Sequence, residues 1–548
     1  MSEQELKLHI PHAARAGVER ELKRGAVTRI RLRALYFDTP SRELVQARVA
    51  LRLRQEGRQW VQTLKMPGEH VLSRVEINHS RPGPVLDLSV YVGTVAETAI
   101  SSITEPLGVC YETDVVRLLR KVRSRHGTVE IAVDTGCLRA GKLELPISEI
   151  EFELLSGKLA AVFELGRKWQ RAYGLILDVR SKSERGDQLA MLAQKLGAIE
   201  SMPEDIQTAA RSAAIAQFWS HRVALPIRLN ADMNAEQALA TVTLECIDQI
   251  TRNACVLAEV DTAGVCKAGT AEHIHQLRVG IRRLRSAWSF FNGITPLSAI
   301  ELRESIKEHF ALLGGTRDDD VLNETILPVL RAAGQPPLLI DKEDTPITWQ
   351  DSVATSVDFQ AWLLAMLESV LIPAPHKVTV PHQSEQTLVT ADGMSPDEAP
   401  TGPIDAHIIP MQPGKPPREL TLKQALVGKL RKWHKQVLRN GLKFNELDIE
   451  ARHALRKRAK KLRYALQFSE ALLPTSKLKT YRKQLSAVQD ILGEMNDLAV
   501  ARERFVALRD LQPSAWFACG WITSRLDALV LDATAAFRQL EKTQKFWR

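Results

Sequence analysis

The sequence predicts an α+β multidomain protein, with an antiparallel β-barrel at the N-terminus and an all-α, duplicated helical domain at the C-terminus. Charged residues alternate with apolar ones in several segments of the first 200 residues, a pattern typical of strands with one apolar face. Long stretches rich in Ala, Leu, Arg and Lys follow at 205–330 and 420–545 and contain few prolines, which favours helices. A motif shared by these two stretches indicates that the helical unit is duplicated.

Length and composition limit the class of protein further. The chain has 548 residues, 45% of them hydrophobic, and a formal net charge of +9, which excludes wholesale disorder and indicates several domains. No run of about 18 apolar residues occurs, and the first ten residues lack an apolar stretch, so we expect neither a membrane partner nor a secretory signal. Six cysteines without a C-x-x-C pair disfavour a disulfide framework and a zinc site.

The alternating segments of the N-terminal region carry charges of both signs. Residues i, i+2 and i+4 of a strand share one face, so Glu3, Glu5 and Lys7 point the same way. The same alternation occurs at Glu149, Glu151 and Glu153 and in the segments with Arg29, Arg31, Arg33, Arg52, Arg54, Lys65, Arg74 and Glu76. The wet face of an open sheet would explain one such strand. Several of them are better explained by a closed barrel with a polar lumen and an apolar outer face packed on helices.

Within this barrel, the position of one arginine segment stays open. Arg29, Arg31 and Arg33 alternate with apolar residues just before the YFDTP run at 36–40. A place in the lumen and a place on the exterior fit this pattern equally well.

The charges of the predicted lumen indicate the kind of ligand that it binds. Clustered carboxylates suit hard divalent cations such as Mg²⁺ or Mn²⁺, and Arg and Lys suit phosphoryl oxygens. Both together indicate a site for a metal and a polyphosphate. Phosphoryl transfer requires mainly positioning and charge neutralisation, so no nucleophilic Ser or Cys is needed. No G-x-x-x-x-G-K-[ST] loop occurs, which excludes a P-loop nucleotidase.

Eight motifs of the N-terminal region resemble those of a known family. They are, in order, Glu3-x-Glu5-x-Lys7, YFDTP at 36–40, LRLR at 51–54, TLK at 63–65, TDVVR at 113–117, IAVDTG at 131–136, the strand 149–153 and SKSERG at 181–186. Together they resemble the CYTH family of triphosphate tunnel metalloenzymes, of the inorganic triphosphatase type. This resemblance implies an eight-stranded antiparallel tunnel with flanking helices that hydrolyses triphosphates with Mg²⁺ or Mn²⁺.

The resemblance also implies roles for residues at matching positions. The implied metal ligands are Glu3, Glu5, Asp134, Glu149, Glu151 and Glu153. The implied catalytic residues, which bind substrate phosphates, are Lys7, Arg52, Arg54, Lys65, Arg117 and Lys182. Arg74 and Glu76 match in position as further substrate-binding residues of the tunnel. In the implied mechanism one metal bridges phosphate oxygens while a second activates water for in-line attack on a terminal phosphorus.

The C-terminal region contains an internal repeat. The first copy starts at His275 and is followed 38 residues later by LGGTRDDDV (313–321), and the second starts at His453 and is followed 39 residues later by LGEMNDLAV (492–500). Two motifs in the same order at nearly the same spacing favour a duplicated helical unit. Between the copies, residues 373–418 hold ten of the 26 prolines, which predicts a flexible insertion.

Each copy of the repeat carries a basic stripe. The residues of the two stripes are His275, Arg278, Arg282, Arg283 and Arg285 in the first copy and His453, Arg456, Lys457, Lys460, Lys461 and Arg463 in the second. Like charges at i,i+4 on a helix repel by roughly 0.2–0.5 kcal/mol per pair, so an anion between the stripes would stabilise them. Residues 429–463 hold 13 basic residues and three acids, an asymmetry that indicates a polyanionic partner.

Alternatives for the stripes are helices paired with acids, or a surface that binds nucleic acid. There is little sign of the aromatic platform expected for single-stranded nucleic acid, which makes nucleic acid a poor candidate and a phosphate polymer the simpler ligand. His273 and His275 diverge on a helix, which disfavours a metal there, and Asp318, Asp319 and Asp320 fit an acidic turn. The repeat resembles the CHAD domain, a conserved-histidine helical module, and this resemblance implies that it binds inorganic polyphosphate.

These observations predict a division of the chain and a function. We expect a CYTH domain at 1–200, a linker at 201–225 and a CHAD domain at 226–548, with helical repeats at about 226–340 and 420–545 and the Pro-rich insertion at about 373–418. The predicted function is metal-dependent hydrolysis of inorganic triphosphate to diphosphate and phosphate, with polyphosphate bound by the CHAD domain. We expect the protein in the cytoplasm, in association with polyphosphate granules.

Other functions remain open on the same residues. The tunnel could act on thiamine triphosphate or a nucleoside triphosphate, or cyclise ATP as an adenylate cyclase does. A protein of another class, which binds polyphosphate granules without catalysis, would have no evident need of the metal ligands.

Overall fold

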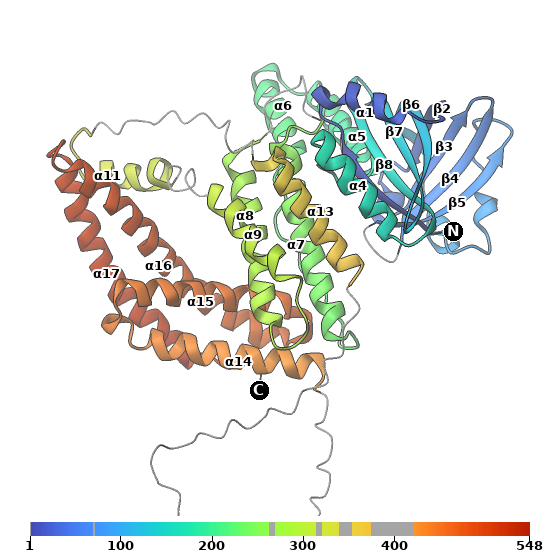
Figure 1. Ribbon diagram of the computed structural model, residues 1–548. Coiled ribbons are helices and arrows are strands. Elements are labelled where there is room, and N and C mark those ends of the chain that lie inside the picture. Colours follow the sequence, from blue (N-terminus) through green and yellow to red (C-terminus); the bar gives the residue numbers. More distant parts are fainter. Residues whose placement is uncertain are drawn as a thin grey trace, which may run out of the picture.

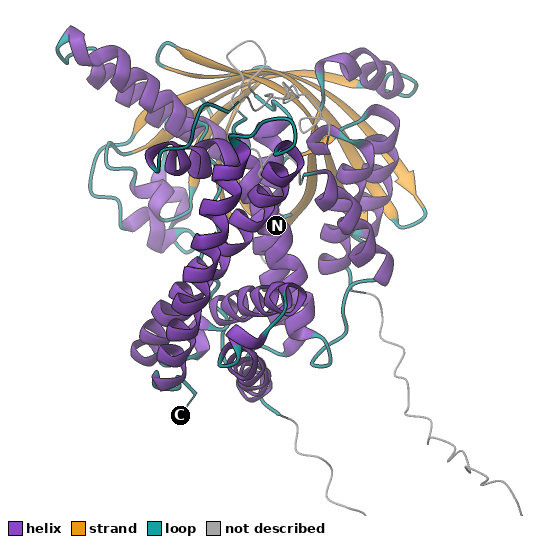
Figure 2. Ribbon diagram, turned by 90° about the vertical axis from the view of Figure 1, so that its left-hand side faces the viewer, coloured by secondary structure: helices purple, strands orange, loops and turns teal. Residues whose placement is uncertain are grey.

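A computed structural model describes residues 2–68, 72–261, 269–313, 321–338, 353–373 and 420–547. A β-barrel with flanking helices forms the N-terminal part, and an elongated array of helices forms the rest (Figure 1). In Figure 2 the strands form one curved wall at the top of the view, and the helices lie in front of it and below it. The predicted α+β fold is therefore confirmed. Among the described helices, none has the length and hydropathy that a membrane span requires.

Within the described residues, eight strands form the barrel. They are β1 (Ser2–His9), β2 (Thr28–Asp38), β3 (Ala50–Glu56), β4 (Gln59–Pro67), β5 (Ser73–Arg81), β6 (Gly108–Ser124), β7 (Gly127–Ala140) and β8 (Leu143–Gly157). Strands adjacent in the order β5-β4-β3-β2-β6-β7-β8-β1 pair in antiparallel fashion, and β1 also pairs with β5. This last pairing closes the barrel and confirms the predicted eight-stranded tunnel. The short strand β9 (Ile176–Leu177) pairs with β1 outside the ring.

The period of two in the strands separates a polar lumen from an apolar exterior. In β1, Leu6 and Leu8 are fully buried on the outer face, beneath helix α4 (Ala160–Tyr173). A Cβ at Gly166 of α4 would lie 2.5 Å from a methyl carbon of Leu6. The close approach of α4 to the barrel wall therefore favours glycine at this position, since any larger residue would displace the Leu6 side chain.

Other helices lie around the barrel. They are α1 (Arg15–Leu22), α2 (Glu43–Gln46), α3 (Glu97–Ser101), α5 (Lys182–Ile199) and α6 (Glu204–Phe218), with the 3₁₀ turns η1 (His12–Ala14) and η2 (Leu88–Tyr91). Helix α5 starts at its N-cap Ser181, whose side chain accepts a hydrogen bond from the Glu184 amide, and it lies against β6 and β7. The segment 201–225, which we expected to be a linker, contains α6, and this helix packs against α5.

The C-terminal region is all-α in its described residues. Its helices are α7 (Ala235–Leu257), α8 (Ala271–Phe291), α9 (Ile300–Leu312), α11 (Leu327–Ala332), α13 (Val357–Leu371), α14 (Leu422–Gly441), α15 (Ile449–Phe468), α16 (Thr475–Leu508) and α17 (Ala515–Lys542). A short π-helix, η3 (Leu322–Ile326), and the 3₁₀ turns η4 (Phe444–Glu446) and η5 (Glu470–Leu472) accompany them. The two histidine motifs lie on α8 and α15, which contact each other. The Pro-rich insertion beyond Pro373 and the acids at 318–320 lie outside the described residues.

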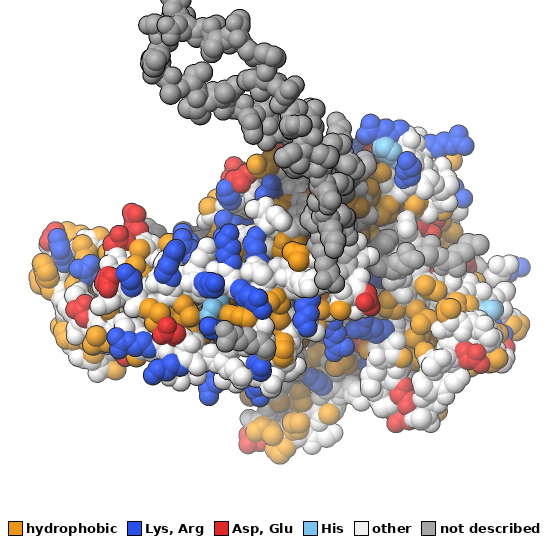
Figure 3. Space-filling view, turned by 90° about the horizontal axis from the view of Figure 1, so that it is seen from below, with side chains coloured by type: hydrophobic (Ala, Val, Ile, Leu, Met, Phe, Trp, Pro, Cys, Tyr) orange, Lys and Arg blue, Asp and Glu red, His pale blue; other side chains and the backbone are white. Residues whose placement is uncertain are grey.

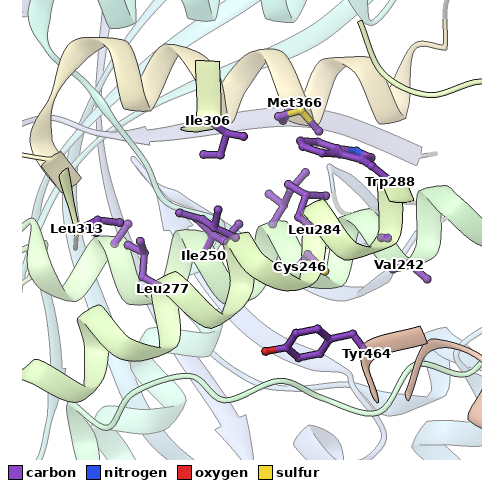
Figure 4. Close-up of a cluster of buried hydrophobic side chains, with 14 of the residues drawn as sticks. Val242, Cys246, Ile250, Leu277, Leu284, Trp288, Ile306, Leu313, Met366 and Tyr464 are labelled. Atoms are coloured by element: carbon purple, nitrogen blue, oxygen red, sulfur yellow. The ribbon is translucent and has the colours of Figure 1, made fainter. Parts of the chain in front are cut away.

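The barrel and the helical region share one hydrophobic core. Its members include Leu6, Leu8 and Phe152 of the barrel together with residues of α7, α8, α13 and α15. Figure 4 labels part of the helical side of this cluster: Val242, Cys246 and Ile250 from α7, Leu277, Leu284 and Trp288 from α8, Ile306 from α9, Met366 from α13 and Tyr464 from α15. The continuity of this cluster holds the helical region against the barrel wall.

Polar contacts join α13 to the barrel as well. Arg167 of α4 forms an ion pair with Glu368 of α13. The Leu177 amide of β9 donates a hydrogen bond of 2.8 Å to the side chain of Gln360 in α13. Helices α4 and α13 therefore form the seam between the two regions, as Figure 1 shows.

Candidate active site

A cavity of about 830 Å³ occupies the lumen of the barrel. Its lining includes most of the residues that the sequence places in the tunnel: Glu3, Glu5, Lys7, Arg52, Arg54, Lys65, Arg74, Glu76, Arg117, Glu151, Glu153 and Lys182. The two others, Asp134 and Glu149, are buried and contact Lys182. The fold thus brings the whole predicted set together.

Strand register aligns the acids across three neighbouring strands. Glu5 of β1 pairs with Glu153 of β8, which pairs with Glu130 of β7. In the same way Glu149 of β8 pairs with Asp134 of β7. Glu130 lines the cavity but was missed in the sequence, although it lies four residues before Asp134 and therefore on the same strand face.

One group of acids is balanced by cations. Carboxylate oxygens of Asp134, Glu149 and Glu151 lie within 4.8 Å of one another. The Lys182 ammonium lies 2.7 Å from both Asp134 and Glu151 and also contacts Glu149. Arg117 donates hydrogen bonds of 2.6 Å to Asp134 and Glu151. Against the opposing effect of burial, Lys182 above all lowers the pKa of Glu149 and of Glu151 to about 2.

A second group of acids, which lies next to the first along β8 and on the neighbouring β1, has an excess of negative charge. Burial, followed by the nearby carboxylates of Glu3 and Glu5, raises the pKa of Glu153 to about 7. Burial and the charge of Glu151 raise the pKa of Glu5. The Lys65 ammonium is 3.7 Å from Glu3 but also forms an ion pair with Glu76. This group has the oxygen donors and the unbalanced charge that suit a hard divalent cation.

The opposite wall of the barrel is basic. In the strand order, β3 and β4 lie across the ring from β8 and β7, and they carry Arg52, Arg54 and Lys65. Burial and the nearby Arg52 lower the pKa of Lys65 to about 8 and that of Arg54 to about 10. These cations destabilise one another in the absence of an anion, so the wall is suited to phosphate oxygens.

The side chains of Arg29, Arg31 and Arg33 lie on the outside of the barrel. Its intervening residues Ile30 and Leu32 line the cavity. Arg31 and Arg33 pair with Asp114 of the neighbouring strand at 2.9 and 3.4 Å. Of the two positions left open by the sequence, the structure therefore favours the exterior.

The two basic stripes of the helical region adjoin. Burial, together with the charges of Arg456 and Arg282, lowers the pKa of Lys460 to about 7, and burial and Arg285 lower the pKa of Lys461. Cations of α8 and α15 are therefore close enough to repel each other. We call the residues of both stripes except Arg283 the basic surface. Lys and Arg side chains also gather on the underside of the helical region, where α14 runs (Figure 3).

Arg283 does not belong to this surface, which corrects the assignment made from the sequence. It is 1% exposed, donates a hydrogen bond of 2.6 Å to Gln249 and forms an ion pair of 2.5 Å with Glu245. One residue turns the helix by about 100°, which takes Arg283 away from Arg282 and towards α7. A stripe read from spacing alone does not reveal which side of a helix faces its neighbour.

Family models match both parts of the chain. The model of the CYTH domain matches residues 1–186, and the model of the CHAD domain matches residues 249–506. Residues 1–186 therefore form a CYTH domain, and residues 249–506 form a CHAD domain.

Individual relatives match shorter parts. An inorganic triphosphatase of Haemophilus influenzae is 32% identical over 160 residues, which are 28% of this chain and 44% of that protein; the match spans less than half of the relative's length. The crystal structure of the CHAD domain from the plant Ricinus communis is 23% identical and covers 59% of this chain and 98% of its own, with a TM-score of 0.41. A putative adenylyl cyclase from Hippeastrum, described as having a dominant triphosphatase activity, is 18% identical and covers 34% of this chain and 95% of its own, with a TM-score of 0.29.

Proposed function

We propose that the barrel hydrolyses inorganic triphosphate to diphosphate and phosphate with the help of a divalent cation. The observation that carries this proposal is the opposition of two walls in one lumen, an acidic one with unbalanced charge and a basic one with mutually repelling cations. A metal–triphosphate complex has the complementary charges, a cation for the first wall and phosphate oxygens for the second.

The acids that would hold the metal are Glu3, Glu5 and Glu153. The raised pKa values of Glu5 and Glu153 indicate that a cation between these carboxylates would relieve repulsion. Asp134 and Glu149, whose carboxylate oxygens lie within 4.8 Å of each other and of Glu151, would hold a second cation. When bound, Mg²⁺ or Mn²⁺ would supply charge neutralisation at phosphate oxygens and a bound water of lowered pKa.

The residues of the chain itself would bind and orient the substrate. Arg52, Arg54 and Lys65 would hold phosphate oxygens from the basic wall, Arg through paired donors and Lys as a point charge. Arg117 and Lys182 would complete the phosphate contacts, and both are held in place by Asp134 and Glu151. Because these cations are oriented before substrate arrives, little reorganisation remains for the reaction.

The substrate preference is tested by steady-state release of phosphate. Inorganic triphosphate, ATP and thiamine triphosphate would be compared at equal concentration with Mg²⁺ and with Mn²⁺. We expect the highest kcat/KM for inorganic triphosphate, because the Arg and Lys side chains that line the lumen are suited to phosphate oxygens along the whole of this substrate. A clear preference for ATP or thiamine triphosphate, or formation of cyclic AMP, would contradict the proposal.

We also propose that the basic surface of α8 and α15 binds inorganic polyphosphate. The lowered pKa values of Lys460 and Lys461 support this, since they reflect cations crowded together that an anion would stabilise. Polyphosphate is a flexible linear anion without bases that need stacking, so a row of cations along two helices matches it. A protein that binds polyphosphate without catalysis would show this binding and no release of phosphate from triphosphate.

A further inference from the structure

We propose that the CHAD domain completes the catalytic tunnel: Asp261, just beyond α7, is a positioning residue for Glu149 and Lys7. The inference rests on the proposed function, because it concerns the same lumen. Asp261 itself is not among the implied metal and phosphate ligands.

A chain of buried ion pairs carries the inference. Asp261 is 3% exposed and accepts hydrogen bonds from Arg185 at 2.7 Å and from Arg180 at 3.2 Å. Arg185 donates its other terminal nitrogen to Glu149 at 2.7 Å. Arg180 binds Asp178 through two hydrogen bonds of 2.9 and 3.0 Å. One carboxylate from the CHAD domain thus holds two arginines of the barrel domain.

The chain of ion pairs ends at the lumen. The Lys7 ammonium lies 3.8 Å from both Glu149 and Asp178, and Glu149 also contacts Lys182. Both lysines line the cavity. Removing Asp261 would leave Arg180 and Arg185 with one carboxylate fewer in a buried site, where an uncompensated charge is costly. The two arginines would then compete with Lys7 and Lys182 for Glu149 and Asp178.

A residue of α7 itself also contacts the first turn of α5, which contains Arg185. Arg252 lines the lumen cavity, forms a bidentate ion pair with Glu184 and is braced by Asp248 at 2.7 Å. Glu184 and Arg185 lie two and three residues after Lys182, in the first turn of α5. This turn is therefore held by Arg252 at one residue and by Asp261 at the next, and Lys182 lies within it.

The backbone conformation at Asp261 also indicates that its contacts hold it in place. Its φ is 68°, and Glu259 two residues earlier has a φ of 55°, in the left-handed region that non-glycine residues rarely adopt. Between them Val260 is buried in a cluster with Ile176 and Cys255. A strained conformation persists only where surrounding contacts hold it, and here the ion pairs of Asp261 supply such contacts.

The test is Asp261→Asn in the full-length protein. We would measure Mn²⁺ affinity by electron paramagnetic resonance, kcat and KM for inorganic triphosphate, and the melting temperature. Substitution of residues that orient metal ligands typically costs about 10–100-fold in affinity or activity, so we expect at least about 10-fold lower kcat and weaker Mn²⁺ binding, with a smaller change in KM. The matched control is Arg167→Gln, which removes the ion pair with Glu368 at the same domain seam and should leave both values within about two-fold, as substitutions away from such sites do.

Two results with these variants would overturn the inference, and a third applies to a substitute variant. One is wild-type kcat and Mn²⁺ affinity in Asp261→Asn; the other is an equal loss in Arg167→Gln, which would indicate a general loosening of the seam. If Asp261→Asn does not fold, Arg252→Gln is measured in its place, and wild-type values there would overturn the inference as well. A wild-type protein that binds Mn²⁺ but does not hydrolyse triphosphate would refute the proposed function alone, since the effect of Asp261→Asn on Mn²⁺ affinity remains measurable.

Discussion

At the scale of single residues, the lumen shows how position along one strand sets the state of a carboxylate. Glu149, Glu151 and Glu153 follow one another on the same face of β8. The first two contact Lys182 and have a pKa of about 2, whereas Glu153 lies among Glu3 and Glu5 and has a pKa of about 7. Within four residues of one strand, the acids therefore change from ones that the Lys182 ammonium neutralises to one that lies among other carboxylates.

Glu5→Gln tests the unbalanced group. Because the substitution removes a proposed metal ligand, we expect kcat/KM for inorganic triphosphate to fall about 100-fold or more, in line with the several kcal/mol that a catalytic metal contributes. In metal-free protein, the same substitution removes a buried charge among like charges and should not lower the melting temperature. Arg31→Gln, on the outside of the barrel, is the control and should retain activity. Undiminished activity in Glu5→Gln would refute the metal assignment.

Lys65 gives the lumen a pH dependence. Its pKa of about 8 means that its charge is present below pH 8 and lost above it. A hydrogen bond from a charged group is worth about 1.5–3 kcal/mol, so kcat/KM for triphosphate should decrease by roughly 10-fold or more as the pH rises from 7 to 9.5. Lys65→Arg keeps the positive charge over this range, so its kcat/KM should not decrease between pH 7 and 9.5. Identical pH profiles in the two proteins would show that another group titrates.

At the scale of elements, α8 and α15 illustrate what spacing along a helix can and cannot predict. The stripes of His275 and His453 were predicted from spacing alone, and the two helices do adjoin. Arg283 was assigned wrongly because only the contact with Glu245 of α7 reveals which side of α8 is buried. Helix α6 lies within the stretch 205–330 that was predicted to be helical, because TAARSAAIAQF is rich in helix-forming residues. The division of the chain nevertheless called 201–225 a linker.

The closeness of α8 and α15 predicts proton uptake when polyphosphate binds. Free Lys460 has a pKa of about 7, and a bound anion favours its charged form, so the pKa rises on binding. Between pH 7 and 9 the complex therefore carries more protons than the free protein, and affinity should decrease as the pH rises. Calorimetric titration with long-chain polyphosphate in buffers of different ionisation enthalpy measures this uptake.

The control for this titration is Lys460→Arg, which should bind with similar affinity and with less proton uptake. Added salt should weaken binding in both proteins, by analogy with counterion release from nucleic acids. Binding without proton uptake in the wild type would place the polyphosphate elsewhere on the molecule. Unchanged binding after combined Arg278→Gln, Arg282→Gln, Arg456→Gln and Lys460→Gln substitution would refute the basic surface as the site.

At the scale of the whole molecule, the barrel could be predicted from local sequence pattern, whereas the contacts between the domains could not. The closed barrel and the lumen acids of β1 and β8 follow from alternation within each strand, because a period of two decides which side chains face inward. Asp134 was placed in the lumen only by the resemblance to the CYTH family. Asp261 and Arg252 carried no such signal, since their partners Arg185 and Glu184 lie more than 65 residues away in the chain. Residues that join two domains depend on how the domains meet, and no single segment encodes that.

The shared core predicts that the CYTH and CHAD domains unfold together. One continuous cluster runs from Leu8 of β1 to helices α7, α13 and α15, and buried ion pairs such as Arg185–Asp261 cross the same seam. Separating the domains would expose apolar surface and unpaired charges, so neither domain should unfold alone. Calorimetry should therefore give one transition, and Leu8→Ala, which removes about 2–5 kcal/mol, should lower its midpoint as a whole. Two resolved transitions, with only one shifted by Leu8→Ala, would mean that the domains are energetically independent.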